Sequence, residues 1–214
     1  MANVPEDSET TRLIAQAVRG DRRALGELLG RHREQLHRMV ALRLDRRLQG
    51  RVDPSDIIQE AYIDASARLA EYARQPDMPF FLWLRFLTGQ RLLRVHRQHL
   101  GAEMRDVARE VSLYRGALPA ATSAALAAQL LGRDTRPSEA AVRAERSIRL
   151  QEALNSMEPL DREVLALRHF EQLSNGEAAR VLGLQESAAA KRYVRALKRL
   201  RLILDARPGG LGDF

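Results

Sequence analysis

Polar and basic side chains near the C-terminus have the types and spacing that bind a polyanion. They lie in and just before residues 187–204, where Tyr193, Leu197, Leu200 and Leu204 share one helical face and the cations occupy the others. Guanidinium groups pair with phosphates and with guanine edges through two hydrogen bonds, which favours a nucleic acid as the polyanion. An amphipathic helix with a solvated basic face is the alternative. The candidate contacts are Gln185, Ser187, Lys191, Arg192, Arg195 and Arg199.

The segment before these residues predicts a helix-turn-helix. Ser174 and Glu177 form a capping-box pattern, Gly183 can end the short helix that follows, and the basic helix begins at Glu186 or Ser187. Such a pair of helices suits insertion of the second one into the major groove. Residues 188–190 are alanines, which offer only methyl contacts. Base recognition would then rest on Gln185, Ser187, Lys191 and Arg192, with Arg195 and Arg199 on phosphates.

An aromatic cluster lies directly before a second group of arginines. The rings are Phe80, Phe81, Trp83 and Phe86, and the arginines are Arg91, Arg94 and Arg97. Aromatic rings beside a basic stripe can stack on unpaired bases while the arginines hold phosphates. The alternative is a core helix with a basic outer face, and Trp83 in particular suits a core.

Two further polar patterns have residue types that could bind a partner or a metal. One face of an otherwise apolar helix carries the polar residues Asp56, Gln59, Glu60 and Asp64. This face either docks on a partner or is simply solvated. His96 and His99 have the i, i+3 spacing of a metal pair, but no acidic or cysteine partner is near in sequence, which favours phosphate contact or solvation. No paired catalytic constellation is visible, so we expect no enzyme, no metal and no cofactor.

Helical periodicity predicts the elements that carry these side chains. The expected helices run from Asp21 to about Arg47, from Asp53 through Leu69, over 80–100 and over 140–157, and then begin at Pro159, at Ser174 and at Glu186 or Ser187. Ile57, Ile58, Ala61, Ile63, Ala65 and Leu69 are the expected apolar face of the second of these. Residues 101–139 are rich in glycine and proline and predict a linker, with 120–131 as a possible short helix. The predicted fold is all-α, two small helical domains joined by a linker, the C-terminal one a helix-turn-helix.

The composition fits a soluble helical protein with an anionic partner. Of 214 residues, 45% are hydrophobic and 29% charged, and the net charge is +7 with a pI near 10.6. Lys191 and Lys198 are the only lysines, and the arginine excess fits either phosphate recognition or a GC-rich genome. The absence of cysteine excludes disulfides and thiolate chemistry. Residues 1–11 lack a signal-peptide core and no run approaches the ~20 apolar residues that span a bilayer. We therefore expect a cytoplasmic protein without membrane contact.

The order and spacing of these motifs resemble a bacterial RNA polymerase sigma factor of the extracytoplasmic-function class. The resemblance covers roughly 11–100 and 150–204, and its motifs are Asp56-Ile57-Ile58-Gln59-Glu60, Phe80-Phe81-Leu82-Trp83-Leu84, Leu160-Asp161-Arg162-Glu163 and the helix-turn-helix. The variant run from Pro79 to Arg85 and the extension over 101–116 resemble a planctomycete-type subgroup. Arg94 stands where many members have an acid, and the alanines at 188–190 replace a common threonine–valine–lysine run.

The resemblance implies a role for each candidate site. Asp56, Gln59 and Glu60 would bind core RNA polymerase, at the clamp helices of its large subunit. Phe80, Phe81, Trp83, Arg91, Arg94 and Arg97 would bind the minus-ten promoter element. Gln185, Ser187, Lys191, Arg192, Arg195 and Arg199 would bind the minus-thirty-five element. The implied partners are core polymerase and promoter DNA, with an anti-sigma factor left open, and the free protein would be a monomer.

The implied domains are a tail over 1–8, the polymerase-binding and minus-ten domain over 9–100, a linker over 101–149, the minus-thirty-five domain over 150–206 and a tail over 207–214. The rival interpretation is a polymerase-independent helix-turn-helix regulator whose N-terminal part serves dimerisation or sensing. Such a regulator would form a stable dimer and bind palindromic DNA alone.

Overall fold

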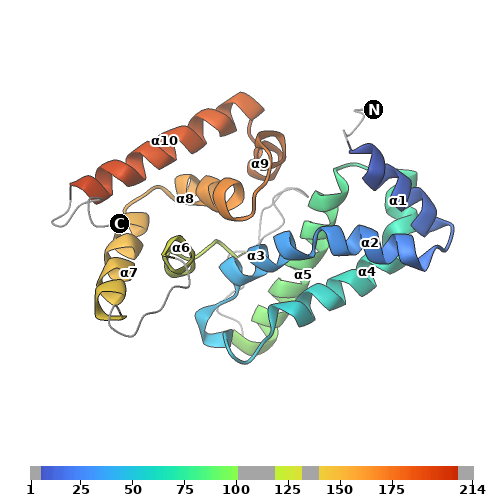
Figure 1. The fold of residues 1–214 in the computed structure, drawn as a ribbon, viewed down its shortest axis with the longest axis horizontal. Helices are drawn as coiled ribbons and strands as arrows, with labels where there is room; N and C mark the ends of the chain where they lie inside the picture. Colours follow the sequence, from blue (N-terminus) through green and yellow to red (C-terminus); the bar gives the residue numbers. More distant parts are fainter. Residues whose placement is uncertain (1–5, 101–118, 132–139, 207–214) are drawn as a thin grey trace. The chain divides into compact units, whose positions relative to one another are not determined.

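The computed structural model describes residues 6–100, 119–131 and 140–206, and in these ranges its regular elements are helices (Figure 1). An isolated bridge between Gln49 and Val52 is the one strand-like pairing in the same ranges. The predicted all-α class is therefore confirmed. The chain forms two compact units, Met1–Pro119 and Ala120–Phe214, which are described separately.

In the part of unit 1 that the structure describes, five α-helices pack around one core. They are α1 (Ser8–Val18), α2 (Arg22–Arg31), α3 (Arg33–Arg43), α4 (Pro54–Arg74) and α5 (Phe80–Leu100). Helix α1 packs on α2 and α4, while α3 and α4 both pack on α5. Asp53 caps α4 by accepting a hydrogen bond from the Ser55 amide (2.8 Å), and Pro54 occupies the first turn, as the sequence predicts.

The stripe predicted as one helix over 21–47 is two helices. Asp21 caps α2 as expected, but the helix ends at Arg31 and α3 starts after His32. The His32 amide donates to the Leu29 carbonyl (3.3 Å), a three-residue turn that closes α2. The His32 ring lies 5.7 and 5.3 Å from the rings of Phe80 and Phe81. The break therefore occurs where the His32 ring packs on α5, a helix that lies far away in sequence. Helix α3 ends at Arg43.

The first helix and its cap lie partly within residues 1–8, the segment that was predicted to be a tail. Asp7 caps α1 by accepting from the Thr10 amide (2.7 Å) and the Thr10 hydroxyl (2.8 Å), which lowers the pKa of Asp7. Glu6 accepts a hydrogen bond from the Phe80 amide (2.8 Å) at the start of α5. Residues 1–5 of the predicted tail lie outside the described residues.

Unit 2 also has five described α-helices. They are α6 (Ser123–Leu130), α7 (Ala140–Asn155), α8 (Pro159–Leu165), α9 (Asn175–Leu182) and α10 (Glu186–Asp205). Helix α6 packs on α7, and α10 packs on α7, α8 and α9 (Figure 1). The alanine-rich piece predicted within the linker is therefore a helix, with Leu126 and Ala127 buried. Residues 101–118, 132–139 and 207–214 of the predicted linker and tail lie outside the described residues.

The helix-turn-helix follows the predicted local signals. The Ser174 hydroxyl accepts from the Glu177 amide (3.2 Å), and the Glu177 carboxylate accepts from the Ser174 amide (2.7 Å). Gly183 ends α9 in the left-handed conformation (φ 64°, ψ 37°). The sequence does not predict the π-helical turn Ala166–Phe170 after α8, in which the Glu171 amide donates to the Ala166 carbonyl (2.9 Å).

Candidate nucleic-acid interfaces

The polar set on α4 forms an exposed face with an apolar member. Asp56, Gln59 and Glu60 are all exposed, so each is available to a partner. Ile63 was expected in the core, but it is 67% exposed. Residues 56, 59, 60 and 63 have the i, i+3, i+4, i+7 spacing of one helical face, which explains why Ile63 joins the polar set. The expected apolar face otherwise holds, with Ile57, Ile58 and Ala61 buried.

Arg91 of α5 is tied to this helix. Its Nε donates to Asp64 Oδ2 (2.5 Å), a second nitrogen donates to the other Asp64 oxygen, and a third donates to Glu60 Oε2 (3.2 Å). The hydrogen bonds from Arg91 lower the pKa of Asp64 and the same contact raises the pKa of Arg91. A residue predicted to bind DNA and one predicted to bind polymerase therefore share one ion pair.

Two of the predicted base-stacking rings belong to the core. Phe80 is 0% exposed and Phe81 is 4% exposed, so neither presents a face to a base. Phe80 packs edge-on against Tyr72, with ring centroids 5.7 Å apart, and Phe81 lies beside His32. The expectation that these two rings stack on bases is wrong for this structure. The cause is the first turn of α5, which points them at His32, between α2 and α3, and at Tyr72 of α4 rather than at solvent.

Trp83 and Phe86 remain partly exposed at a hollow on unit 1. The hollow has a volume of about 780 Å³ and is bordered by the end of α4, the connection 75–79 and the start of α5. Trp83 stacks on Tyr72 with ring centroids 4.6 Å apart and planes at 25°. The Tyr72 hydroxyl donates to the Met78 carbonyl (2.9 Å), which holds the connection, and burial raises the pKa of Tyr72. The lining is Arg68, Glu71, Tyr72, Arg74, Gln75, Asp77, Met78, Trp83 and Phe86.

The far end of α5 exposes Arg94, Arg97 and one histidine and buries the other histidine. Arg94 and Arg97 are exposed. His96 is 2% exposed, and its Nε2 accepts a hydrogen bond from the Asp45 amide (3.2 Å), so the expectation of phosphate contact or solvation is wrong for His96. Burial lowers the pKa of His96. His99 is exposed as expected.

The arginines predicted on α10 divide between two faces. Arg192 donates to Asp161 Oδ1 (2.6 Å) and lies 3.4 Å from a Glu158 oxygen. Arg199 donates to the other Asp161 oxygen (3.3 Å) and lies 3.7 Å from Glu158. The Asp161 side chain is only 8% exposed. Arg192, at 26% exposure, is therefore a structural ion-pair partner of α8, which the sequence did not indicate.

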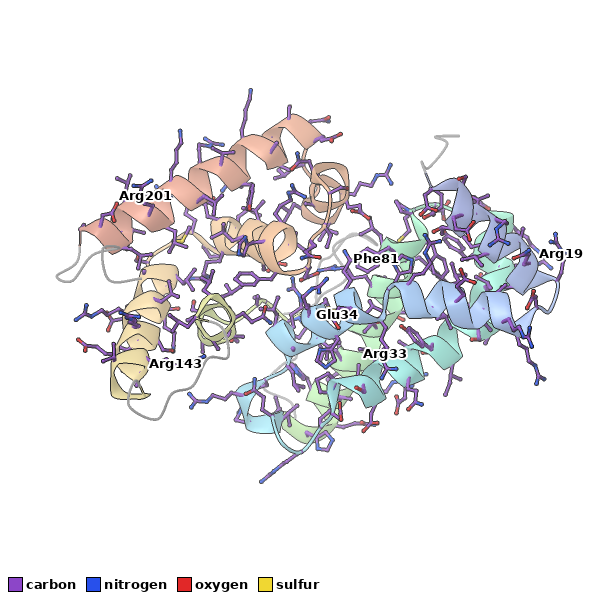
Figure 2. All side chains as sticks on the ribbon, viewed as in Figure 1. Arg19, Arg33, Glu34, Phe81, Arg143 and Arg201 are labelled. Atoms are coloured by element: carbon purple, nitrogen blue, oxygen red, sulfur yellow. The ribbon has the colours of Figure 1, made fainter. Side chains whose placement is uncertain are left out.

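The other predicted contacts of α10 lie on its solvent side. Gln185, Ser187, Lys191 and Arg195 are all exposed. The alanine run splits in the same way, because Ala188 is exposed whereas Ala189, at 1% exposure, packs inside. Arginine side chains also project elsewhere in the chain, among them Arg19 at the end of α1 and Arg143 on α7 (Figure 2). Position on a helix face, not residue type, therefore selects the candidate DNA contacts.

Within 6–100, 119–131 and 140–206, no group of three or more possible metal ligands comes together. None of the helices in these ranges has the length and apolar content needed to cross a membrane.

The comparisons with known proteins point to one family. The model of the family "Sigma-70, region 4" matches residues 147–200, which span the end of α7 and the helix-turn-helix. The chain is 29% identical to the ECF RNA polymerase sigma factor SigD of Mycobacterium tuberculosis over 189 residues, 88% of this chain and 81% of that protein. A solved structure of CnrH in complex with the cytosolic domain of CnrY has a similar fold, with a TM-score of 0.53 at 24% identity, covering 94% of this chain and 100% of that one.

A second relative extends over nearly the whole of both sequences. The chain is 30% identical to the RNA polymerase sigma factor CnrH of Cupriavidus metallidurans over 212 residues, 94% of this chain and 97% of that protein. On this similarity, the chain belongs to the extracytoplasmic-function family of RNA polymerase sigma factors.

Proposed function

We propose that this protein is a sigma factor that binds core RNA polymerase, recognises promoter DNA and directs transcription initiation. The observation that carries the proposal is the family similarity over almost the entire chain, which includes both the α4 polar face and the helix-turn-helix. The protein works without chemistry of its own, by positioning polymerase on DNA in the cytoplasm, and it is a monomer when free.

The N-terminal domain, over 9–100, docks on the polymerase. Its contact face is Asp56, Gln59 and Glu60, three exposed polar side chains on consecutive turns of α4. Family resemblance assigns this face to the clamp helices of the large subunit. Exposed polar side chains cost little folding stability when replaced, so a loss of polymerase binding can be measured without loss of the fold.

The same domain captures the minus-ten element with a smaller aromatic set than the sequence indicated. Phe80 and Phe81 stabilise the fold. Trp83, together with Phe86 at the hollow, supplies the partly exposed rings for unpaired bases, and Arg94 and Arg97 supply exposed cations for phosphates. Arg91 contributes through its exposed edge only, because Asp64 and Glu60 occupy its nitrogens.

The C-terminal domain, over 150–206, binds the minus-thirty-five element through the solvent side of α10. Gln185, Ser187, Lys191 and Arg195 are the contacts, and Arg192 orients the helix through Asp161.

The chain belongs to the planctomycete-type subgroup, on the run from Pro79 to Arg85. It also has an anti-sigma partner, by analogy with CnrH, whose solved structure contains the cytosolic domain of CnrY.

Co-purification with core polymerase followed by run-off transcription tests the proposal. The wild-type chain should bind core and start transcription at defined positions, and Asp56→Ala with Gln59→Ala should weaken core binding. Glu27→Ala, an exposed carboxylate on α2, is the matched control and should bind as wild type. A stable dimer that binds palindromic DNA without core would instead support the regulator.

A further inference from the structure

An apolar hollow lies on the solvent side of α10, among the predicted DNA contacts. Ala190, Lys191, Val194 and Arg195 line it, and its volume is about 530 Å³. Val194 is 49% exposed, although a β-branched apolar side chain is usually placed in a core. The opposite face of α10 packs inside, with Ala196 at 0% and Leu200 at 8% exposure, so the helix cannot bury Val194 by rotation.

The hollow occupies the positions from which a helix recognises bases. Ser187, Ala190, Lys191 and Val194 are spaced i, i+3, i+4, i+7, the same spacing as the base-contacting residues of the homeodomain recognition helix. These residues belong to the first half of α10, which starts at Glu186. A helix laid in the major groove from this end would place Val194 against a base edge, not against the backbone.

The major groove offers one apolar group to such a side chain. Base edges there carry hydrogen-bond donors and acceptors, and only thymine adds a 5-methyl group. Two cations, Lys191 and Arg195, line the hollow one helical turn apart on the same side of α10, and their positive charge suits a polyanion. Charge complementarity therefore favours DNA over an apolar protein segment as the occupant.

We propose that Val194, with Ala190, contacts the 5-methyl group of a thymine in the upstream promoter element, so that part of the sequence preference comes from a methyl contact. This inference rests on the proposed function. It also assigns a use to the alanine at 190, where a larger or polar side chain would fill the hollow.

Substitution of deoxyuridine for thymine tests the contact, because deoxyuridine pairs in the same way and lacks only the methyl group. The holoenzyme is first used to select promoter fragments from a library randomised upstream, and each thymine of the selected element is then replaced singly. One replacement should lower affinity about fourfold, which corresponds to the ~0.8 kcal/mol gained by burying one CH₂-sized group. Val194→Ala should bind the thymine and deoxyuridine fragments equally.

Leu202→Ala is the matched control, because Leu202 is 68% exposed on α10 and lies outside the hollow, and it should keep the thymine preference. Circular dichroism checks that both variants fold. Equal binding of every deoxyuridine fragment by the wild type overturns the inference and leaves the sigma-factor function intact. A Val194→Ala variant that keeps the thymine preference also overturns it, and loss of affinity for a protein partner in that variant would assign the hollow to that partner. Failure of the holoenzyme to select any promoter would instead contradict the proposed function itself.

Discussion

The two units keep different parts of the predicted DNA-binding set inside the fold. In unit 1 two of the four predicted aromatic side chains, Phe80 and Phe81, are in the core, whereas Arg94 and Arg97 face solvent. In unit 2 an arginine is held by a nearly buried carboxylate: Arg192, itself 26% exposed, contacts Asp161, whereas Lys191 and Arg195 face solvent.

The carboxylates that hold the arginines differ as well. Asp64 and Glu60, which hold Arg91, are 34% and 56% exposed, while Asp161 is 8% exposed. Solvent-exposed pairs contribute little to stability, and breaking a buried one leaves an uncompensated charge. The exposure of the partner carboxylate therefore distinguishes an arginine that can turn to DNA from one that maintains the fold.

The largest expected effect is on unit 1. Phe80→Ala removes a fully buried ring and should lower the free energy of unfolding of unit 1 by about 3–5 kcal/mol. Trp83 is the only tryptophan of the chain and lies in unit 1, so its fluorescence during urea unfolding reports this unit alone. Phe86→Ala, at a partly exposed ring, should cost less. Equal losses for the two variants would contradict the assignment of Phe80 to the core.

The next effect is on unit 2. Arg192→Ala should lower the free energy of unfolding of unit 2 by about 2–3 kcal/mol, because Asp161 keeps only the longer contact with Arg199. Circular dichroism should show the unit 2 transition at lower urea while the Trp83 fluorescence transition stays in place. Arg195→Ala is the control and should change stability by no more than about 0.5 kcal/mol. If the two variants unfold alike, Arg192 has no special structural role.

A smaller effect concerns pH and His96. Burial lowers the pKa of His96 in the folded state, with Asp45 acting in the opposite direction and Arg47 in the same direction. Because the unfolded chain binds the proton first, the stability of unit 1 should fall as pH drops below about 6.5, the ordinary histidine value, toward the lower folded pKa. His96→Gln should flatten this part of the curve in urea unfolding followed by Trp83 fluorescence. An unchanged slope below pH 6.5 would show that other groups cause it.

Local signals in the sequence predicted most helix ends. The capping residues Asp21, Asp53 and Ser174, and the left-handed Gly183, act through hydrogen bonds or backbone conformation within a few residues. Their effects are therefore visible in a single stretch of sequence. Helix α1 was missed although Asp7 caps it in the same way, because its first turn, residues 8–11, has no apolar residue.

The features that the sequence did not predict depend on contacts between segments far apart in sequence. The break at His32 coincides with rings 48 residues or more away, and Arg192 is engaged because its partner Asp161 lies on a different helix. The spacing of apolar residues shows which of them share a helical face. It does not show which of these residues another helix covers. Phe80 and Ile63 illustrate this, since each was assigned to the wrong side.

The salt dependence of promoter binding tests most directly the claim that this sigma factor contacts upstream DNA with the solvent side of α10. The holoenzyme is titrated with a promoter fragment at several salt concentrations, using the wild type, Arg195→Ala and Arg199→Ala. Each phosphate contact adds about 0.9 to the slope of log K against log salt. We predict that Arg195→Ala lowers the slope by about that amount and that Arg199→Ala, whose side chain is engaged with Asp161, lowers it by less than half as much. An unchanged slope for Arg195→Ala, or equal losses for the two variants, would contradict the account.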